Sequence, residues 1–259
     1  MNNNILKLKN MYLEKSKHSN YQIIPKRLRG ELGNLHAKVK ETYEEERLNY
    51  ILSKIDLKYK TILDIGGNIG FFTFEMIDNG VKTVHYFEGN KNHSEFVKLA
   101  TKVAELEDKI KVTNKYYLFD NIHNINEEKY DITLLLNVVH HIGEDYGDNN
   151  ISINNAKKNI LQQINNLSLI TETLIFQLGF NWKGNVGMNL FCNGTKKEMI
   201  NYIVEGTKDY WEVIHIGIPE FIEEKIKYCD LNNKNIERNN ELGEFLNRPI
   251  FIMKSSKCL

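Results

Sequence analysis

The sequence predicts an α/β protein with a mostly parallel, seven-stranded sheet that is covered by helices on both faces. Segments with strand-like and helix-like patterns alternate along most of the chain, which is typical of parallel sheets. Asp131–Val139 is apolar along almost its whole length, as expected of a strand buried on both faces. The short strand Thr61–Ile65 leads directly into a glycine-rich turn and then a helix.

A helix is predicted before the first strand, because Leu48, Ile51 and Ile55 recur on one helical face. Thr42 and Glu45 have the spacing of a capping box at its start. The other expected elements, in chain order, are a helix from about Gly70 to Asn79-Gly80, a strand at Val81–Glu88, a helix at Asn92–Glu105, strands at Lys109–Val112 and Asp131–Val139, a helix at Asn154–Leu167, a strand at Thr173–Phe180, a helix from about Thr195, and strands at Trp211–Ile218 and Arg248–Lys254.

Charge is balanced over the whole chain but not along it. The 259 residues carry 34 Lys and Arg against 34 Asp and Glu, which argues against a protein whose main task is to grip phosphate backbones. Residues 1–40, however, hold nine basic residues and two acidic ones. We expect this helical lead-in to form an arm or lid, and residues 41–259 to form the main domain.

The three cysteines, at positions 192, 229 and 258, have no CxxC spacing, so the sequence indicates neither a zinc site nor a disulfide framework. The N-terminal segment lacks an apolar core long enough for a signal peptide, and no later run approaches the length of a membrane span. A cytoplasmic location is therefore expected.

The turn "DIGGNIG" points to a particular kind of ligand. Glycines after a buried strand allow a tight turn close to a ligand. Asp64 stands just before them, where a carboxylate would repel a phosphate but would suit an ammonium group. Glu88 follows at the end of the next strand, a position from which an acidic side chain accepts hydrogen bonds from ribose hydroxyls.

The stretch "ILDIGGNIG…VHYFEGN" resembles the first motif and the acidic second-strand motif of class I S-adenosylmethionine (SAM)-dependent methyltransferases. Its turn is similar to that of sugar and small-molecule O-methyltransferases, and the resemblance covers roughly residues 61–180. It implies a Rossmann-like domain that binds SAM and releases S-adenosylhomocysteine. The cofactor-binding residues that it implies are Asp64, Gly66, Gly67, Asn68, Gly70, Glu88, Phe119, Asp120 and Asn137.

The implied roles differ along this set. Asp64 and the turn would hold the methionyl part, and Glu88 the ribose hydroxyls. Asp120 would lie beside the adenine amine with Phe119 against the ring, although Asp120 is equally a candidate for a loop-capping aspartate. Asn137 would face the methionyl group from the end of the fourth strand.

The histidine pair in "NVVHHIGEDYG" is the candidate catalytic group. A histidine with a near-neutral pKa suits removal of a proton from an alcohol that attacks the methyl group. His140 is the stronger candidate for the base, because a histidine at the position of His141 occurs in relatives with quite different acceptors. Glu144 or Asp145 is a candidate orienting carboxylate. We expect no metal site, because these carboxylates lack a clear set of partners.

Two segments are candidates for acceptor binding. The lead-in combines polar and basic side chains that would suit an anionic acceptor, or would equally suit a solvated tail. The loop after the fifth strand joins an aromatic face to amide groups, as in a sugar-binding wall, or forms an oligomer contact. The substrate-binding candidates are Tyr21, Gln22, Lys26, Arg27, Arg29, Asn181 and Trp182.

The sequence therefore predicts an O-methyltransferase for a small polar, anionic acceptor such as a nucleotide-activated sugar used in surface polysaccharide biosynthesis. The alternatives are a tRNA wobble-base methyltransferase, in which the lead-in contacts RNA, and a SAM-binding partner protein without catalysis. A dehydrogenase is disfavoured by Asp64. We expect no membrane-spanning segment and no nucleic-acid partner, and the chain is a candidate homo-oligomer.

Overall fold

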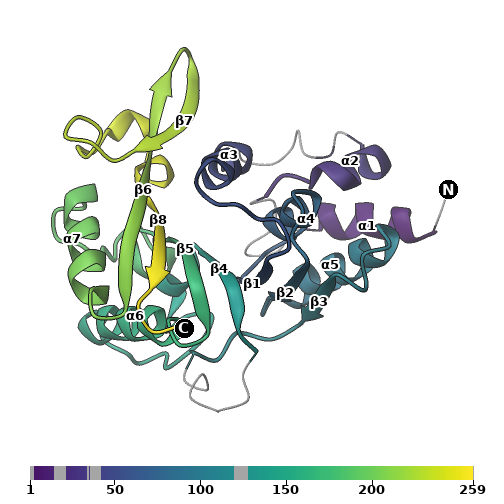
Figure 1. The fold of residues 1–259 in the computed structure, drawn as a ribbon, viewed down its shortest axis with the longest axis horizontal. Helices are drawn as coiled ribbons and strands as arrows, with labels where there is room; N and C mark the ends of the chain where they lie inside the picture. Colours follow the sequence, from purple (N-terminus) through teal and green to yellow (C-terminus); the bar gives the residue numbers. More distant parts are fainter. Residues whose placement is uncertain (1–2, 15–21, 34, 36–41, 120–127, 259) are drawn as a thin grey trace. The chain divides into compact units, whose positions relative to one another are not determined.

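The computed structural model describes residues 3–14, 22–33, 35, 42–119 and 128–258. The chain divides into two compact units, Met1–Tyr117 and Leu118–Leu259, each of which is considered by itself. Figure 1 labels the helices and strands of both units.

The first unit contains a parallel three-stranded segment in the order β3-β2-β1. The strands are β1 (Thr61–Ile65), β2 (Thr83–Phe87) and β3 (Ile110–Thr113). The helices are α1 (Asn3–Leu13), α2 (Lys26–Leu32), α3 (Glu44–Lys54), α4 (Phe71–Asp78) and α5 (Lys91–Val103). In the β1–β2 register Asp64 lies opposite Tyr86, so the glycine turn and the acidic residue after β2 leave the same end of the strands.

The described part of the basic lead-in packs within the first unit. Tyr12 of α1 is buried, and its ring lies 6.2 Å from that of Phe96 on α5. Helix α2 is connected to α4 by a hydrogen bond at its first residue. The backbone N–H of Lys26 donates to the buried carboxylate of Glu75 at 2.7 Å. The lead-in is thus anchored by both apolar and polar contacts.

The capping box predicted for α3 is wrong. The helix begins at Glu44, and Tyr43 occupies the N-cap position in the left-handed conformation (φ 56°) without a side-chain cap. Thr42 lies one residue too early to cap the helix, and its hydroxyl donates to the Glu44 carboxylate instead.

The second unit contains five strands in the order β4-β5-β8-β6-β7. The pair β4 (Tyr130–Leu136) and β5 (Thr171–Gln177) is parallel, whereas β8 (Ile250–Ser255), β6 (Trp211–Ile222) and β7 (Lys225–Asp230) pair antiparallel. The helices are α6 (Ile153–Leu167) and α7 (Lys196–Thr207), and the short 3₁₀ turns are η3 (Val139–His141), η4 (Trp182–Gly184), η5 (Asn240–Leu242) and η6 (Phe245–Asn247).

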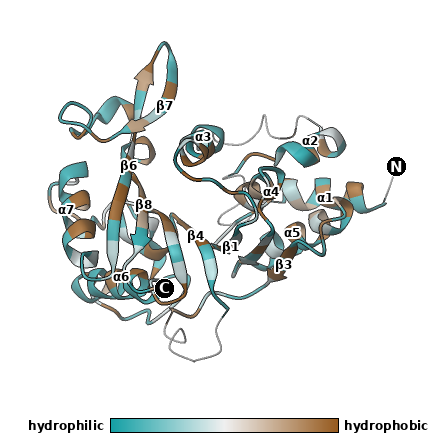
Figure 2. Ribbon diagram, in the orientation of Figure 1, coloured by the Kyte–Doolittle hydropathy of each residue, from teal (hydrophilic) through white to brown (hydrophobic). Residues whose placement is uncertain are grey.

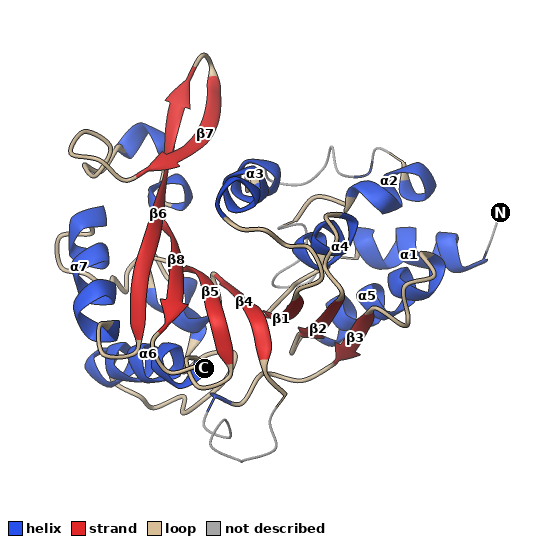
Figure 3. Ribbon diagram, in the orientation of Figure 1, coloured by secondary structure: helices blue, strands red, loops and turns tan. Residues whose placement is uncertain are grey.

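The described residues form eight strands rather than the predicted seven, and the strand pairing is mixed. The additional strand is β7, which lies in a segment that the sequence analysis took as polar connection. It pairs with residues 217–222 of β6, whereas β8 pairs with residues 211–217, and Figure 3 shows this hairpin extending past β8. Its turn is Glu223-Glu224, and both residues have positive φ (53° and 63°). A two-residue hairpin turn requires that conformation, which glycine and asparagine usually supply.

The other predicted elements are confirmed. The bounds of β1 match the prediction fully, and those of α6 differ by one residue at the start. Figure 2 shows hydrophobic and hydrophilic residues mixed along the helices that cover the strands, as expected of amphipathic elements. Within the described ranges, no helix combines the length and the apolar character needed to cross a bilayer.

Candidate functional site

The turn between β1 and α4 has a backbone that its sequence is suited to adopt. Gly66, Asn68 and Gly70 all have positive φ, at 70°, 53° and 83°, and asparagine tolerates this region better than most residues. At Gly67 a Cβ atom would come within 2.5 Å of the Tyr86 ring and 2.8 Å of the Asp64 carboxylate. Any larger residue there would therefore displace either the strand partner or the acidic group.

Asp64 is a buried carboxylate at the end of β1. Its side chain is 4% exposed, and one oxygen, Oδ2, accepts a hydrogen bond of 2.5 Å from the Thr73 hydroxyl on α4. Burial raises the pKa of Asp64 to about 7; the Thr73 bond opposes the rise and the charge of Glu88 adds to it. Among the residues that the structure describes, none donates to Oδ1 or forms an ion pair with this carboxylate. Oδ1 of Asp64 could therefore accept a hydrogen bond from a positively charged group of a ligand.

Glu88 is held at the other side of the turn by backbone amides. Its Oε2 accepts from the Asn68 N–H at 3.0 Å, and its Oε1 from the Asn90 N–H at 2.7 Å. These two bonds fix the position of the Glu88 carboxylate at the end of β2. The turn and the end of β2 are therefore joined into one structure, which we call the cradle.

Tyr116 is a residue of this cradle that the sequence analysis did not single out. A Cβ atom on Gly89 would come within 2.3 Å of its ring, so the ring lies directly over the residue that follows Glu88. The side chain is 46% exposed, so one part of the ring is accessible to solvent. Among the sequence signals, only the small residue at position 89 could have indicated a ring packed there.

The two adenine-site predictions remain predictions. Phe119 belongs to the second unit, where its buried ring lies 6.2 Å from that of Tyr146 and its carbonyl accepts from Asn166. Asp120 lies outside the described residues.

The three basic lead-in candidates lie on α2 and face acidic side chains of α4 and α3. Arg27 pairs with Asp78 on α4, and Arg29 pairs with Glu45 on α3 at 2.6 Å. The Lys26 ammonium lies 3.7 Å from Glu75, also on α4. Each of these cations therefore has an acidic partner within the first unit. The side chain of Gln22 contacts the first residue of α4, Phe71. Tyr21 lies outside the described residues.

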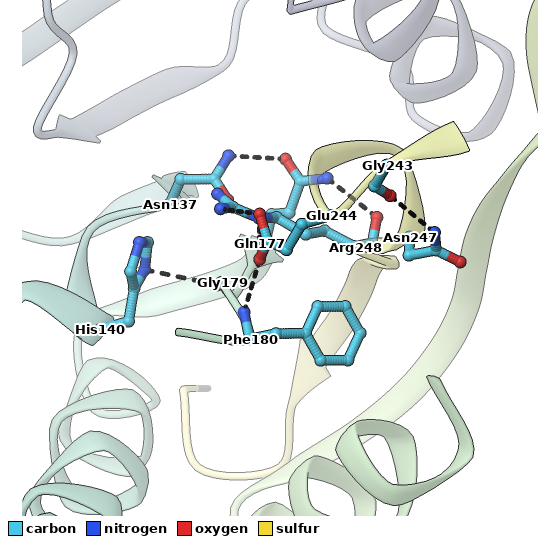
Figure 4. Close-up of polar contacts among 9 residues, drawn as sticks. All are labelled: Asn137, His140, Gln177, Gly179, Phe180, Gly243, Glu244, Asn247 and Arg248. Atoms are coloured by element: carbon cyan, nitrogen blue, oxygen red, sulfur yellow. Dashed lines mark hydrogen bonds and ion pairs between the residues drawn. The ribbon is translucent and has the colours of Figure 1, made fainter. Parts of the chain in front are cut away.

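In the second unit, Asn137 is fixed by a network that joins β4 and β5 to the segment before β8 (Figure 4). Its φ is 63°. Its side-chain amide donates to Gln177 at 2.8 Å and accepts from Arg248 at 2.8 Å, and Arg248 also bonds both oxygens of Glu244. Oε1 of Glu244 also accepts a hydrogen bond from the Phe180 N–H at 2.9 Å. The left-handed backbone of Asn137 is thus held by its own side chain.

The two histidines that follow Asn137 have different environments. His140 is 3% exposed, and its Nδ1 accepts from the Gly179 N–H at 3.4 Å, as Figure 4 shows. That bond places the ring proton of the neutral imidazole on Nε2, which then acts as a donor. A Cβ atom at position 179 would come within 2.8 Å of the same ring, so the ring packs closely on this glycine.

His141 instead meets the two carboxylates that follow it. Its Nδ1 lies 3.4 Å from both Glu144 Oε2 and Asp145 Oδ2, and its ring is 4.3 Å from that of His140. If Nδ1 carries the proton toward these carboxylates, the lone pair of the neutral ring is on Nε2. Both carboxylates are thus near the His141 ring, and their predicted role in orienting a histidine stays a prediction.

The same three side chains have donor types that hold divalent cations, with ligand atoms within 4.8 Å of one another. The absence of a metal ion from the function of this protein stays a prediction.

The segment after β5 lies against this histidine loop, residues 137–145. Trp182 is buried, and its indole N–H donates to the Ile142 carbonyl at 2.8 Å. Asn181 forms an isolated antiparallel bridge with Asn189. Lys183 has a left-handed backbone (φ 56°), and its ammonium lies 4.5 Å from the centre of the Trp182 ring. The sequence analysis included Asn181 and Trp182 but missed Lys183.

The fold is shared with solved methyltransferases at low sequence identity. WbdD, a bifunctional kinase-methyltransferase, aligns over 95% of this chain and 46% of its own, with 12% identity and a TM-score of 0.55. A protein from Streptococcus mutans that has been assigned as a SAM-dependent methyltransferase aligns over 82% of this chain and 48% of its own, with 13% identity and a TM-score of 0.51. This chain thus spans about half the length of each.

No family model matches the sequence, and no curated protein matches it. The structural similarity confirms the Rossmann-like class of the predicted fold: this chain has the α/β fold of SAM-dependent methyltransferases, with a mixed sheet. At these identities the similarity defines the fold, and the chemistry has to be argued from the residues described above.

Proposed function

We propose that this protein is a SAM-dependent methyltransferase that methylates a hydroxyl group of a small, polar, anionic acceptor. The observation that carries this proposal is the buried Asp64 carboxylate beside the glycine turn, to which the described residues supply one hydrogen-bond donor, Thr73, and no cation. An isolated buried charge is costly. An ammonium group on the ligand would remove that cost.

The cradle suits SAM in particular because its two acidic groups are placed for two different parts of that molecule. Asp64 would receive the methionyl ammonium, and Glu88, fixed by the Asn68 N–H, would receive the ribose hydroxyls. Gly67 lets the backbone lie close to both. Tyr116 offers an aromatic face next to the ribose position, where an adenine ring would stack.

For the transfer step we favour His141 as the base, with Glu144 and Asp145 as its orienting partners. The His141 Nε2 would take the hydroxyl proton while the acceptor oxygen attacks the methyl carbon, and sulfur would leave with the bonding pair as S-adenosylhomocysteine. His140 is instead turned toward the Gly179 amide. This reverses the order of preference that the sequence analysis gave to the two histidines.

An anionic acceptor is supported by Lys183. A Cβ atom on the neighbouring Gly184 would lie 3.3 Å from the His141 ring, so the lysine backbone passes close to the proposed base. Its left-handed φ is a conformation that costs about 1 kcal/mol for a residue other than glycine. Such strain is common at binding sites, and here it would direct a cation toward a phosphate or carboxylate group. A nucleotide-activated sugar fits this description.

The charge distribution favours a small acceptor over RNA. The formal net charge is zero, and Arg27 and Arg29 of the lead-in have acidic partners within the first unit. A phosphate backbone would have to compete with those carboxylates for the same cations. RNA methylation is therefore an outcome of the test below and not our proposal.

The test is transfer of labelled methyl groups from SAM to a cell extract that has been separated into small-molecule, polymer and RNA pools. We expect label in the small anionic pool, with none when Asp64 is replaced by asparagine. Label in RNA would refute the proposed acceptor class. Absence of SAM binding by the purified protein would refute the proposal as a whole.

A further inference from the structure

Gln22 bonds directly to the helix that follows the glycine turn. Its side-chain oxygen Oε1 accepts a hydrogen bond of 3.2 Å from the Phe71 N–H, the first amide of α4. Its backbone carbonyl accepts from the Tyr12 hydroxyl at 3.3 Å. Both bonds lie within the first unit, so the position of Gln22 relative to the turn is set by two separate helices.

The orientation of the Gln22 amide follows from the first of these bonds. A backbone N–H can only donate, so the side-chain atom that faces Phe71 must be the oxygen. The other atom, Nε2, therefore presents two N–H donors beside the first turn of α4. Within the described part of the chain, Nε2 donates to no other group.

The turn thus has an open acceptor at one end and an open donor at the other. Asp64 Oδ1 precedes the glycines, and Gln22 Nε2 lies beside the residue that follows them. An acceptor and a donor of this kind suit the two charged groups of an amino acid, its ammonium and its carboxylate. The start of a helix also favours a negative group.

We propose that Gln22 binds the carboxylate of the methionyl group of SAM through Nε2. This inference rests on the proposed function and assigns Gln22 to the cofactor, whereas the sequence analysis assigned it to the acceptor. The lead-in would then form part of the cofactor site, and SAM would be recognised as a zwitterion by Asp64 and Gln22 together.

A purely structural role for Gln22, as a cap for α4, can be separated from this one by a matched variant. Gln22→Glu keeps an oxygen for the Phe71 N–H and removes both N–H donors, while it adds a negative charge. The helix cap is therefore preserved and the proposed contact is not. Gln22→Ala removes both and serves as the comparison.

The experiment is titration calorimetry of the full chain and its variants with SAM and with decarboxylated SAM, which differs only in lacking the carboxylate. For Gln22→Glu we expect an unchanged melting temperature, SAM binding weakened by about tenfold or more, and no loss of affinity for decarboxylated SAM. The wild-type protein should prefer SAM over the decarboxylated compound by a similar factor.

Three results would overturn the inference. Unchanged SAM affinity of Gln22→Glu, together with a loss for Gln22→Ala that is equal for the two ligands, would mean that Gln22 acts only as a helix cap. Equal wild-type affinities for the two ligands would mean that the carboxylate is not recognised, although the proposed function would still stand. A wild-type protein that binds neither compound would refute the proposed function together with this inference.

Discussion

Replacing Asp64 with asparagine should make the unliganded protein more stable at alkaline pH. The carboxyl group is buried, and burial is the main reason that its pKa is raised from 3.8 to about 7. In the unfolded chain the group ionises near its ordinary pKa. The folded protein therefore bears the cost of a buried negative charge that the unfolded chain does not, once the pH exceeds both values.

The magnitude follows from the size of the shift. The shift from 3.8 to about 7 spans about three pKa units, each of which corresponds to about 1.4 kcal/mol. The cost is absent below pH 3.8, grows between pH 3.8 and 7, and reaches about 4 kcal/mol at pH 8. Asparagine has nearly the same shape and still accepts from the Thr73 hydroxyl, so it should remove the pH-dependent part.

The measurement is urea unfolding of the wild-type protein and Asp64→Asn at several pH values between 4 and 8. The far-UV circular dichroism signal follows helices of both units, whereas Trp182 and Trp211 are the two tryptophans of the chain and belong to the second unit. Comparison of the two signals shows whether the units unfold together. A stability difference that is the same at pH 4 and pH 8 would refute the reasoning.

Binding should change in the opposite direction. An ammonium ligand requires the ionised carboxylate, so SAM affinity of the wild-type protein should fall as the pH drops below about 7, by about tenfold per unit. Asp64→Asn should bind SAM weakly at every pH in this range. A variant that is more stable and yet inactive is the signature of a charge kept for function.

Three further predictions concern the second unit. His141→Asn should lower methyl transfer by about 100-fold or more with little change in SAM affinity. His140→Asn should mainly lower the melting temperature. Loss of transfer on adding EDTA would show that His141 is a metal ligand instead of a base. Lys183→Ala should raise the KM for a charged acceptor more than for its uncharged analogue, Lys183→Arg should preserve the KM, and equal effects on both acceptors would exclude a charge contact. Glu223→Asn combined with Glu224→Gly should stabilise the protein by about 1 kcal/mol in thermal or urea unfolding, because both positions have positive φ; a loss of stability would show that the glutamates make contacts outweighing their strain.

The strand and turn that carry the proposed cofactor residues were predictable because their signals are local. The bounds of β1 and the positions of Asp64 and Glu88 follow from a short apolar run, a glycine turn and strand pairing. These features depend on residues close in sequence. The hairpin strand β7 was missed for the same reason, because Glu223-Glu224 carries none of the residues that usually mark a two-residue turn.

The roles of the remaining side chains depend on contacts that the sequence does not contain. Arg27 and Arg29 looked available for an anion, but their acidic partners come from α4 and α3. The distinction between His140 and His141 rests on a backbone amide 39 residues away and on two neighbouring carboxylates. Residue type alone indicates a histidine base, and only the fold shows which of the two rings has a carboxylate next to its Nδ1.

The position of β8 between β5 and β6 has a consequence for how the protein is made. On the ribosome, β6 and β7 emerge before β8, the strand that pairs with both β6 and β5. Until β8 is synthesised, the edge of β6 that faces it stays unpaired. Arg248, which precedes β8, also bonds Asn137 at a separation of 111 residues. The backbone in front of the histidine pair therefore acquires the last of these side-chain bonds only after residue 248 has been synthesised. A nascent chain shorter than this should lack the Arg248 bond to Asn137 even if its glycine turn is already folded.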